Sequence, residues 1–183
     1  MPIVINGTGT LSGLSAESIT PTTIGNGAII QVVQASSKEH LSSTSTSYVD
    51  LPGVTASITP SSASNKILII CSIAISKEAN HSFIGRIVRD GSAITGAGGE
   101  KESGHTSQAD GAWWLIRSTI HDVSPCTVTY LDSPSSTSSL TYKAQGSTSD
   151  GSKGFGFNQT KDSQNNAYAS PGFSSILLME LVA

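Results

Sequence analysis

The chain has 183 residues, of which 37% are hydrophobic and 13% charged, with a formal net charge of −3. A chain of this length is expected to form one domain that buries enough surface to fold without a disulfide or a metal. The acidic balance and the lack of any basic cluster argue against binding to nucleic acid. The longest apolar run, Ile67–Cys71, is far shorter than the roughly 18 residues that a membrane helix needs, and Met1–Gly7 does not look like a secretory signal.

The first 27 residues differ from the rest and are predicted to form an extended arm with its linker, followed by one domain over residues 28–183. A short apolar run and a turn open the arm, and Glu17–Gly27 has the Thr, Ser, Gly and Pro content of a linker. Its few apolar side chains cannot bury one another, so we expect them to attach to another surface. A flexible leader without a partner is the alternative. The attachment residues are Ile3, Val4, Ile5, Leu11 and Leu14.

From Ala28 onward, strand patterns follow one another. Ala28–Gln34 is rich in β-branched residues, and the apolar segments Tyr48–Leu51 and Val54–Thr59 flank Pro52-Gly53, which predicts a turn between two strands. Lys66–Ser76 is the strongest element, because every second residue from Ile67 to Ile75 is apolar. Its other series changes from Leu68 and Ile70 to Ser72 and Ala74, which predicts burial on both sides at its start and on one side at its end.

The second half continues in the same way. Asp90-Gly91 predicts a two-residue hairpin turn between His81–Asp90 and Ser92–Thr95, and Gly96–Asp110 is predicted to be an exposed loop. The remaining predicted strands are Ala112–Ile120, Cys126–Leu131, Leu140–Gln145 and Ser174–Val182, the middle two forming a hairpin across Asp132–Ser139. The spacing of these strands predicts an all-β, antiparallel sandwich or barrel.

No arrangement of residues predicts catalysis, a cofactor or a metal. The nucleophile signature G-x-S-x-G and the phosphate-binding loop G-x-x-x-x-G-K-[ST] are absent, and the four histidines have no metal-ligand spacing. Gly96–Gly99 is glycine-rich but lies in no strand–helix–strand unit, so a flexible loop is expected rather than a nucleotide site. Cys71 and Cys126 lie in apolar strand-like contexts, which favours buried reduced thiols over a bridge.

Trp113 and His105 are the candidate interface or receptor contacts. Trp113 and Trp114 are neighbours on a predicted strand, so their side chains should point to opposite faces. An outward ring could stack on a sugar or fill a subunit interface, and the interface is favoured. His105 lies in the predicted loop Gly96–Asp110.

The order of three segments resembles a family of phage virion proteins, the small tail-fibre and related appendage proteins of cyanophages and other marine phages. The opening Ile3–Leu14 is similar to the N-terminal segment of such fibres. The most specific similarity joins Ile30–Gln34, Ser43–Asp50 and Ser57–Ile69, and a third stretch runs from Tyr130–Pro134 through Leu140–Lys143 to Ile176–Leu181. Together these segments cover most of the chain.

The resemblance implies an antiparallel jelly-roll-like β-sandwich, a homotrimer, displayed on a virion that is assembled in the host cytoplasm. The arm would then hold other tail, baseplate or capsid proteins. We expect the loops Gly96–Asp110 and Gly146–Phe157 to lie together at the distal end, where they contact host-surface glycans or remain inert.

Two functions outside catalysis stay open. The favoured one is a tail fibre or baseplate appendage with a receptor-binding head. The alternative is a capsid decoration, cement or head-fibre protein that bridges capsid subunits. An enzyme such as a polysaccharide depolymerase is the least favoured reading, so we predict no enzymatic activity.

Overall fold

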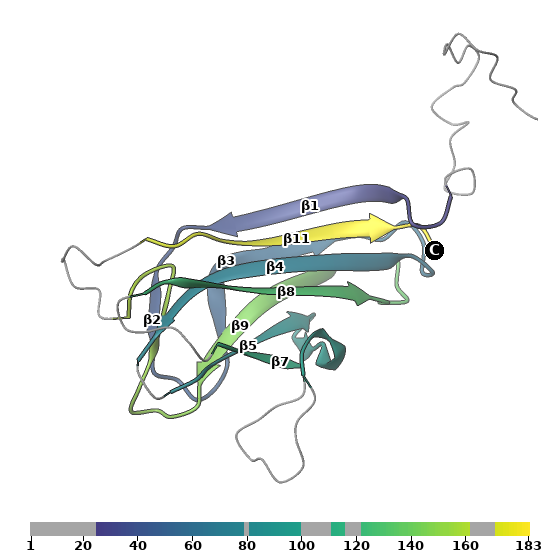
Figure 1. Cartoon of the computed structure of the whole chain (residues 1–183). Helices are drawn as coiled ribbons and strands as arrows, with labels where there is room; N and C mark the ends of the chain where they lie inside the picture. The colour runs from purple at the N-terminus through teal and green to yellow at the C-terminus, as the bar shows by residue number, and fades with distance from the viewer. Residues whose placement is uncertain (1–24, 79–80, 100–110, 116–121, 162–170) are drawn as a thin grey trace, which may run out of the picture.

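The structure is a computed structural model, and it describes residues 25–78, 81–99, 111–115, 122–161 and 171–183. The described residues form two antiparallel sheets that pack face to face (Figure 1). Sheet A contains β1 (Ile29–Ser37), β2 (Leu41–Ser43), β4 (Lys66–Lys77), β8 (Ser124–Asp132), β10 (Phe155–Phe157) and β11 (Ser174–Leu181). Sheet B contains β3 (Val49–Ile58), β5 (Phe83–Arg89), β6 (Ser92–Ala93), β7 (Ala112–Leu115) and β9 (Leu140–Thr148), and a 3-10 turn, η2, spans Thr95–Ala97.

The strand order is that of a jelly roll. Short β10 continues the line of β11 along β4, and β2 continues that of β1, so sheet A reads β1-β11-β4-β8 across its width. Sheet B reads β3-β9-β5-β7. Apart from the step from β5 to β7, successive long strands alternate between the two sheets, which is the winding of a double Greek key. The predicted all-β sandwich is therefore confirmed.

The core lies between the sheets and follows the alternation of the sequence. Ile67, Ile69, Cys71, Ile73 and Ile75 of β4 are all fully buried, as predicted, and they meet Leu51, Ile58 and Ile87 of sheet B in one cluster. Phe83 and Phe155 close this core with an edge-to-face contact at 4.9 Å between ring centroids. Within the described residues, no helix has the length and apolarity needed to cross a membrane.

Two sequence predictions about how the strands connect are wrong. Pro52-Gly53 does not separate two strands: Gly53, at φ 71°, lies inside the continuous strand β3, at a shift in its register with β9. The segments Cys126–Leu131 and Leu140–Gln145 do not form a hairpin, because β8 pairs with β4 and β9 pairs with β3 and β5. Local alternation indicates a strand but not the sheet to which it belongs.

The burial gradient of β4 is the reverse of the prediction. Leu68 and Ile70 are half-buried, whereas the end of the strand from Ala74 to Lys77 is buried on both faces. The outer face is covered there because Asn158 N–H donates to the Ala74 carbonyl and Ser76 Oγ donates to the Gln159 carbonyl.

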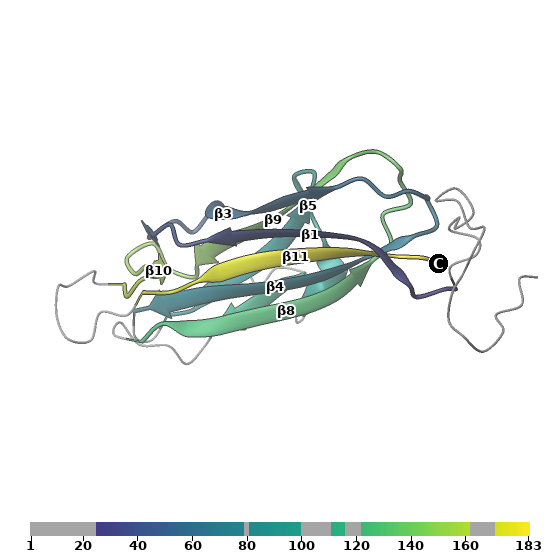
Figure 2. The same ribbon diagram turned by 90° about the horizontal axis from the view of Figure 1, so that it is seen from above.

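The sandwich has two different ends. Gly25, the first residue of β4 and the last of β11 lie at one end, which we call the terminal end (right in Figures 1 and 2). The end of β4, the start of β5 and the end of β9 lie at the other, which we call the loop end. A 12-residue strand joins the two ends, which separates them by about 36 Å at the usual rise per residue. The arm residues Ile3, Val4, Ile5, Leu11 and Leu14 lie outside the described residues.

Candidate functional site at the loop end

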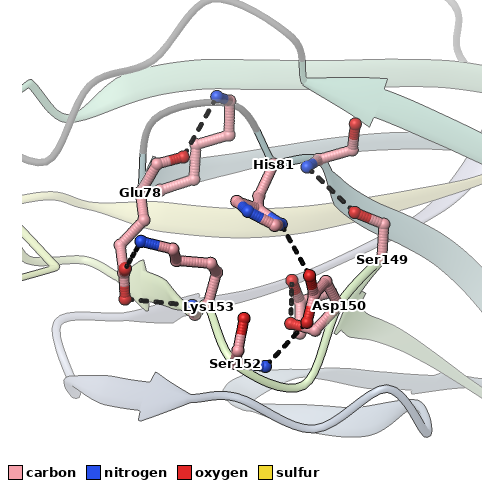
Figure 3. A network of polar contacts seen from close by, with 10 residues as sticks. Glu78, His81, Ser149, Asp150, Ser152 and Lys153 are labelled. Carbon is pink, nitrogen blue, oxygen red and sulfur yellow. Dashed lines mark hydrogen bonds and ion pairs between the residues drawn. The ribbon is translucent and has the colours of Figure 1, made fainter.

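A set of polar side chains links the turns of the loop end (Figure 3). Glu78 follows β4, His81 precedes β5, and Asp150 and Lys153 lie in the turn between β9 and β10. These turns are short and rich in Ser, Gly and Asp, residues that hydrogen-bond their own backbone or tolerate tight turns. The site is therefore built by segments far apart in the sequence.

Glu78 is held from two sides. Lys153 Nζ lies 3.5 Å from its Oε2 and Lys161 Nζ lies 3.4 Å from its Oε1, to which the Gly154 N–H also donates at 3.1 Å. Burial raises the pKa of Glu78, but the Gly154 bond and the lysine charges outweigh it, so the pKa is lowered. Gly154 is required by close packing, because a Cβ there would lie 2.5 Å from Lys161 Cε and 2.6 Å from the Ser43 carbonyl oxygen.

His81 and Asp150 form the second part of the site. Their Nδ1 and Oδ2 atoms are 3.8 Å apart, and the Ser152 N–H donates to Asp150 Oδ1 at 2.8 Å. The Ser152 bonds are the main cause of a lowered pKa for Asp150, and the charges of His81 and Lys153 add to the effect. Nearby, the Ser82 N–H donates to Ser149 Oγ and the Ser149 N–H donates to the Ser82 carbonyl, both at 3.2 Å.

An exposed aromatic ring lies at the same end. Phe173 immediately precedes β11 and keeps 54% of its surface exposed. The neighbouring Ser174 is buried, and its Oγ donates to Asn158 Oδ1 at 2.6 Å, so the backbone beside the ring is firmly held. Together the loop end offers a flat aromatic surface, two carboxylates, two lysines and several hydroxyls, which can bind a polar ligand.

Within the part of the chain that the structure describes, no hydrogen bond joins His81 to a hydroxyl group that could act as a nucleophile. Asp150, the acidic partner of His81, is half exposed, and the Ser149 Oγ accepts a backbone N–H rather than bonding to His81. Among the described residues, no three His, Cys, Asp or Glu side chains are grouped so that they could hold a metal ion. The arrangement supports binding chemistry.

A hollow separate from the loop-end site lies nearer the terminal end, on the side of the sandwich. It encloses about 200 Å³ and is lined by Arg89, Ile94, Thr95, Gly96 and Tyr130, with Ser92 and Ala93. Arg89 Nη1 donates to the buried Asp132, which also accepts a hydrogen bond from Tyr142. The charge of Arg89 is thus already balanced within the protein, which leaves mainly hydroxyl groups to face a ligand.

The described parts of the two loops that were expected together lie in different places. The described base of the loop Gly96–Asp110 contacts Tyr130 and Ile94, whereas residues 146–157 surround the end of β4 and the start of β5. Residues 146–157 lie at the end that faces away from Gly25. Residues 100–110 lie outside the described residues, so the expectation of one combined distal loop surface stays a prediction.

Of the two residues predicted as contacts, the structure describes one. Trp113 is half-buried: its ring packs on the core, and a Cβ on Gly85 would lie 2.7 Å from it. Among the residues that the structure describes, its buried indole Nε1 has no hydrogen-bond partner. The ring thus lies at the edge of the core rather than fully outward, and its contact role stays a prediction. His105 lies outside the described residues.

The residues that make up the loop-end site were not predicted from the sequence. Glu78, Lys153, Lys161 and Phe173 are scattered along the chain, and no spacing rule groups them. The available signal was indirect: Asp150-Gly151 marks a turn, and a charged pair of lysines flanks the glycine-spaced aromatic segment after it. No known protein-family model and no curated protein sequence matches the chain, so the arguments on function come from its own residues.

Proposed function

We propose that the chain is a structural protein of a phage particle, a tail-fibre or baseplate appendage that is held by its N-terminal arm and contacts the host surface with its loop end. The observation that carries the proposal is the separation of the two ends. Gly27, the last residue of the arm, donates its N–H to the Val182 carbonyl, and the polar loop-end site is at the opposite end of β4. A rigid sandwich between a tether and a recognition surface suits an appendage.

The chemistry of the loop end supports a glycan as the host ligand. Sugars present hydroxyl groups together with apolar ring faces, and an exposed aromatic ring at the same end of the sandwich as carboxylates, lysines and hydroxyls can match both. Phe173 would supply the stacking surface, and Glu78 and Asp150 would accept hydrogen bonds from hydroxyl groups. The proposed partners are therefore a host-surface glycan at the loop end, virion proteins at the arm, and further copies of this chain in a homotrimer.

Locating the protein in intact particles by electron microscopy with a bound antibody fragment tests the proposal. Label at the tail or baseplate is the expected result. Label on the capsid surface would overturn it in favour of a capsid decoration protein.

Two variants separate the roles of the two ends. Deleting residues 1–27 is expected to leave a folded domain that no longer joins the particle, whereas Phe173→Ala is expected to join normally but to bind host cells at least tenfold more weakly. Thr55→Ala, which removes an exposed side chain of β3, is the matched control and should change neither property.

A further inference from the structure

The outer face of sheet A carries apolar side chains in registered rows at its terminal end. Cross-strand pairing places Val32, Met179, Leu68 and Leu131 side by side on β1, β11, β4 and β8. All four point away from the core, because their neighbours along each strand are the inward-facing residues. Val32 keeps 57% of its surface exposed and Leu131 keeps 42%.

The neighbouring rows define the limits of this surface. Leu177 and Ile70 form the middle of the next row, between Gln34 and Thr129. Beyond them, toward the loop end, comes a row made only of hydroxyl residues. That row contains Ser36, Ser175, Ser72 and Thr127.

On the other side, Ile29, which is 53% exposed, lies beside Leu181, and Leu181 pairs in turn with the exposed Lys66. The face is therefore apolar near the terminal end, where Lys66 marks a charged edge, and polar toward the loop end.

We call the surface formed by the three rows from Val32 to Thr127 the sheet A face, and its area suits the centre of a protein interface rather than a whole one. Four strands about 4.8 Å apart, crossed by three rows about 6.7 Å apart, outline roughly 400 Å² of flat sheet. Single exposed apolar residues are ordinary, but a contiguous patch of several hundred Å² marks an interaction surface. A standard interface takes about 800 Å² of accessible surface from each partner, usually an apolar centre within a polar rim. The apolar rows and the hydroxyl row provide such a centre and rim.

We infer that the sheet A face binds a second copy of this chain. Rotational symmetry brings like surfaces together, so a self-associating face must be free of repelling charges. The three rows from Val32 to Thr127 contain no charged residue, although 13% of the chain is charged. Such a face matches another copy of itself and has nothing to attract the charged headgroups of a lipid surface. The inference deepens the self-association included in the proposed function by assigning residues to it.

The test measures the mass of the purified full chain by light scattering and sedimentation. The wild-type protein is expected to be an oligomer of the 18.8 kDa chain. The variants Val32→Glu and Leu131→Glu are each expected to weaken association at least 100-fold, because each would bury a charge against an apolar surface. The control Thr55→Glu places the same charge on the outer face of sheet B, at an exposed position of β3, and should associate normally.

Folding of the variants is checked by far-ultraviolet circular dichroism. Since Val32 and Leu131 are largely exposed in the single chain, both variants should keep the β spectrum. If the added charge prevents folding, Val32→Thr and Leu131→Thr replace the Glu variants in the association measurement. A smaller loss of association is then expected.

Two results would overturn the inference: a wild-type protein that is a single subunit at all concentrations, or an oligomer that neither Glu variant weakens. In the first case, stronger binding of a hydrophobic dye after deletion of residues 1–24 would show that the chain's own N-terminal segment covers the face. Because these measurements use purified protein, they stand apart from its location in a particle. An appendage position disproved by microscopy would leave the sheet A face in place as the self-association surface.

Discussion

Tyr142 Oη donates a 2.7 Å hydrogen bond to Asp132 Oδ2, and this bond joins the two sheets through the core. Tyr142 lies in β9 of sheet B and Asp132 in β8 of sheet A, and both side chains are buried. Arg89, which is partly exposed, donates to the same carboxylate oxygen. A buried carboxylate is tolerated because charge-assisted hydrogen bonds compensate for its lost hydration.

We predict that Tyr142→Phe lowers the free energy of unfolding by about 1–2 kcal/mol, since it removes one hydrogen bond to a buried charge that Arg89 still pairs. Asp132→Ala should cost more, about 3 kcal/mol, because it leaves the Tyr142 hydroxyl buried without a partner and Arg89 without its counter-ion. Urea unfolding monitored by fluorescence measures both. Thr141→Ala, which removes an exposed hydroxyl bonded to Ser57, is the control and should stay within about 0.5 kcal/mol of wild type.

Asn158 is predicted to be the most sensitive single residue of the loop end. It is fully buried at φ 55°, and its Nδ2 donates to the carbonyls of Ser37 and Glu39, at 3.1 and 3.0 Å. Its Oδ1 accepts from Ser174, so one amide connects the end of β1 to the start of β11.

Two substitutions at this position separate the backbone effect from the hydrogen bonds. Asn158→Gly keeps the left-handed conformation and loses the bonds, whereas Asn158→Ala also strains the backbone. We expect losses of about 2–3 kcal/mol for Gly and about 1 kcal/mol more for Ala, measured by urea unfolding. Equal stability of the Ala variant and wild type would contradict the role given to this amide.

The strands could be predicted because apolar and polar residues alternate along them, as expected for a strand with one buried face. In β4 the inward series from Ile67 to Ile75 is uninterrupted, and in β11 the inward Ile176 and Leu178 alternate with outward residues. The turn at Asp90-Gly91 was equally readable, since both residues have the positive φ of a tight hairpin, at 49° and 82°.

What the pattern could not provide was the assignment of strands to sheets and of loops to ends. Cys126–Leu131 and Leu140–Gln145 have the same local appearance as a hairpin, but the segment between them crosses from sheet A to sheet B. The coverage of Ala74 depends on Asn158, 84 positions along the chain. The loop-end site was out of reach for the same reason, because Glu78 meets Lys153 and Lys161 only after folding.

Glu78 gives a prediction about pH. The pKa of Glu78 is lower in the folded protein than in the unfolded chain, where it is near 4.5. The carboxylate therefore stabilises the fold at pH values above 4.5, and this stabilisation is lost as the pH falls through the folded-state pKa. Glu78→Gln should therefore lower the free energy of unfolding near neutral pH, by no more than about 1 kcal/mol because the lysine pairs are partly exposed. As the pH falls below the lowered folded-state pKa, the variant and the wild type should converge.

Urea unfolding at several pH values measures this difference, and high salt should reduce it. Glu39→Gln, at an exposed position in the loop end, is the control and should keep the wild-type stability near neutral pH. A difference between Glu78→Gln and wild type that persists in acid would contradict the ion-pair explanation and indicate a packing effect.

The two cysteines are free and face the core from adjacent strands, Cys71 paired with Val128 and Cys126 with Ile73. Burial raises the pKa of Cys71 to about 12 and that of Cys126 to about 11. Because the thiolate is the reactive form, a thiol reagent near pH 8 should hardly label the native protein. Cys126, which is half-buried, should react first.

Alkaline pH should weaken the fold for the same reason. Because both thiols have a raised pKa in the folded protein, their burial stabilises the fold fully below the pKa of an unfolded cysteine, near 9.0. This stabilisation is lost as the pH rises toward 11 or 12. Cys71→Ala should lose part of this alkaline sensitivity, as followed by urea unfolding near pH 8 and pH 10. Concentrated guanidinium chloride should make both thiols react; finding none there would reveal a disulfide and contradict the reduced pair.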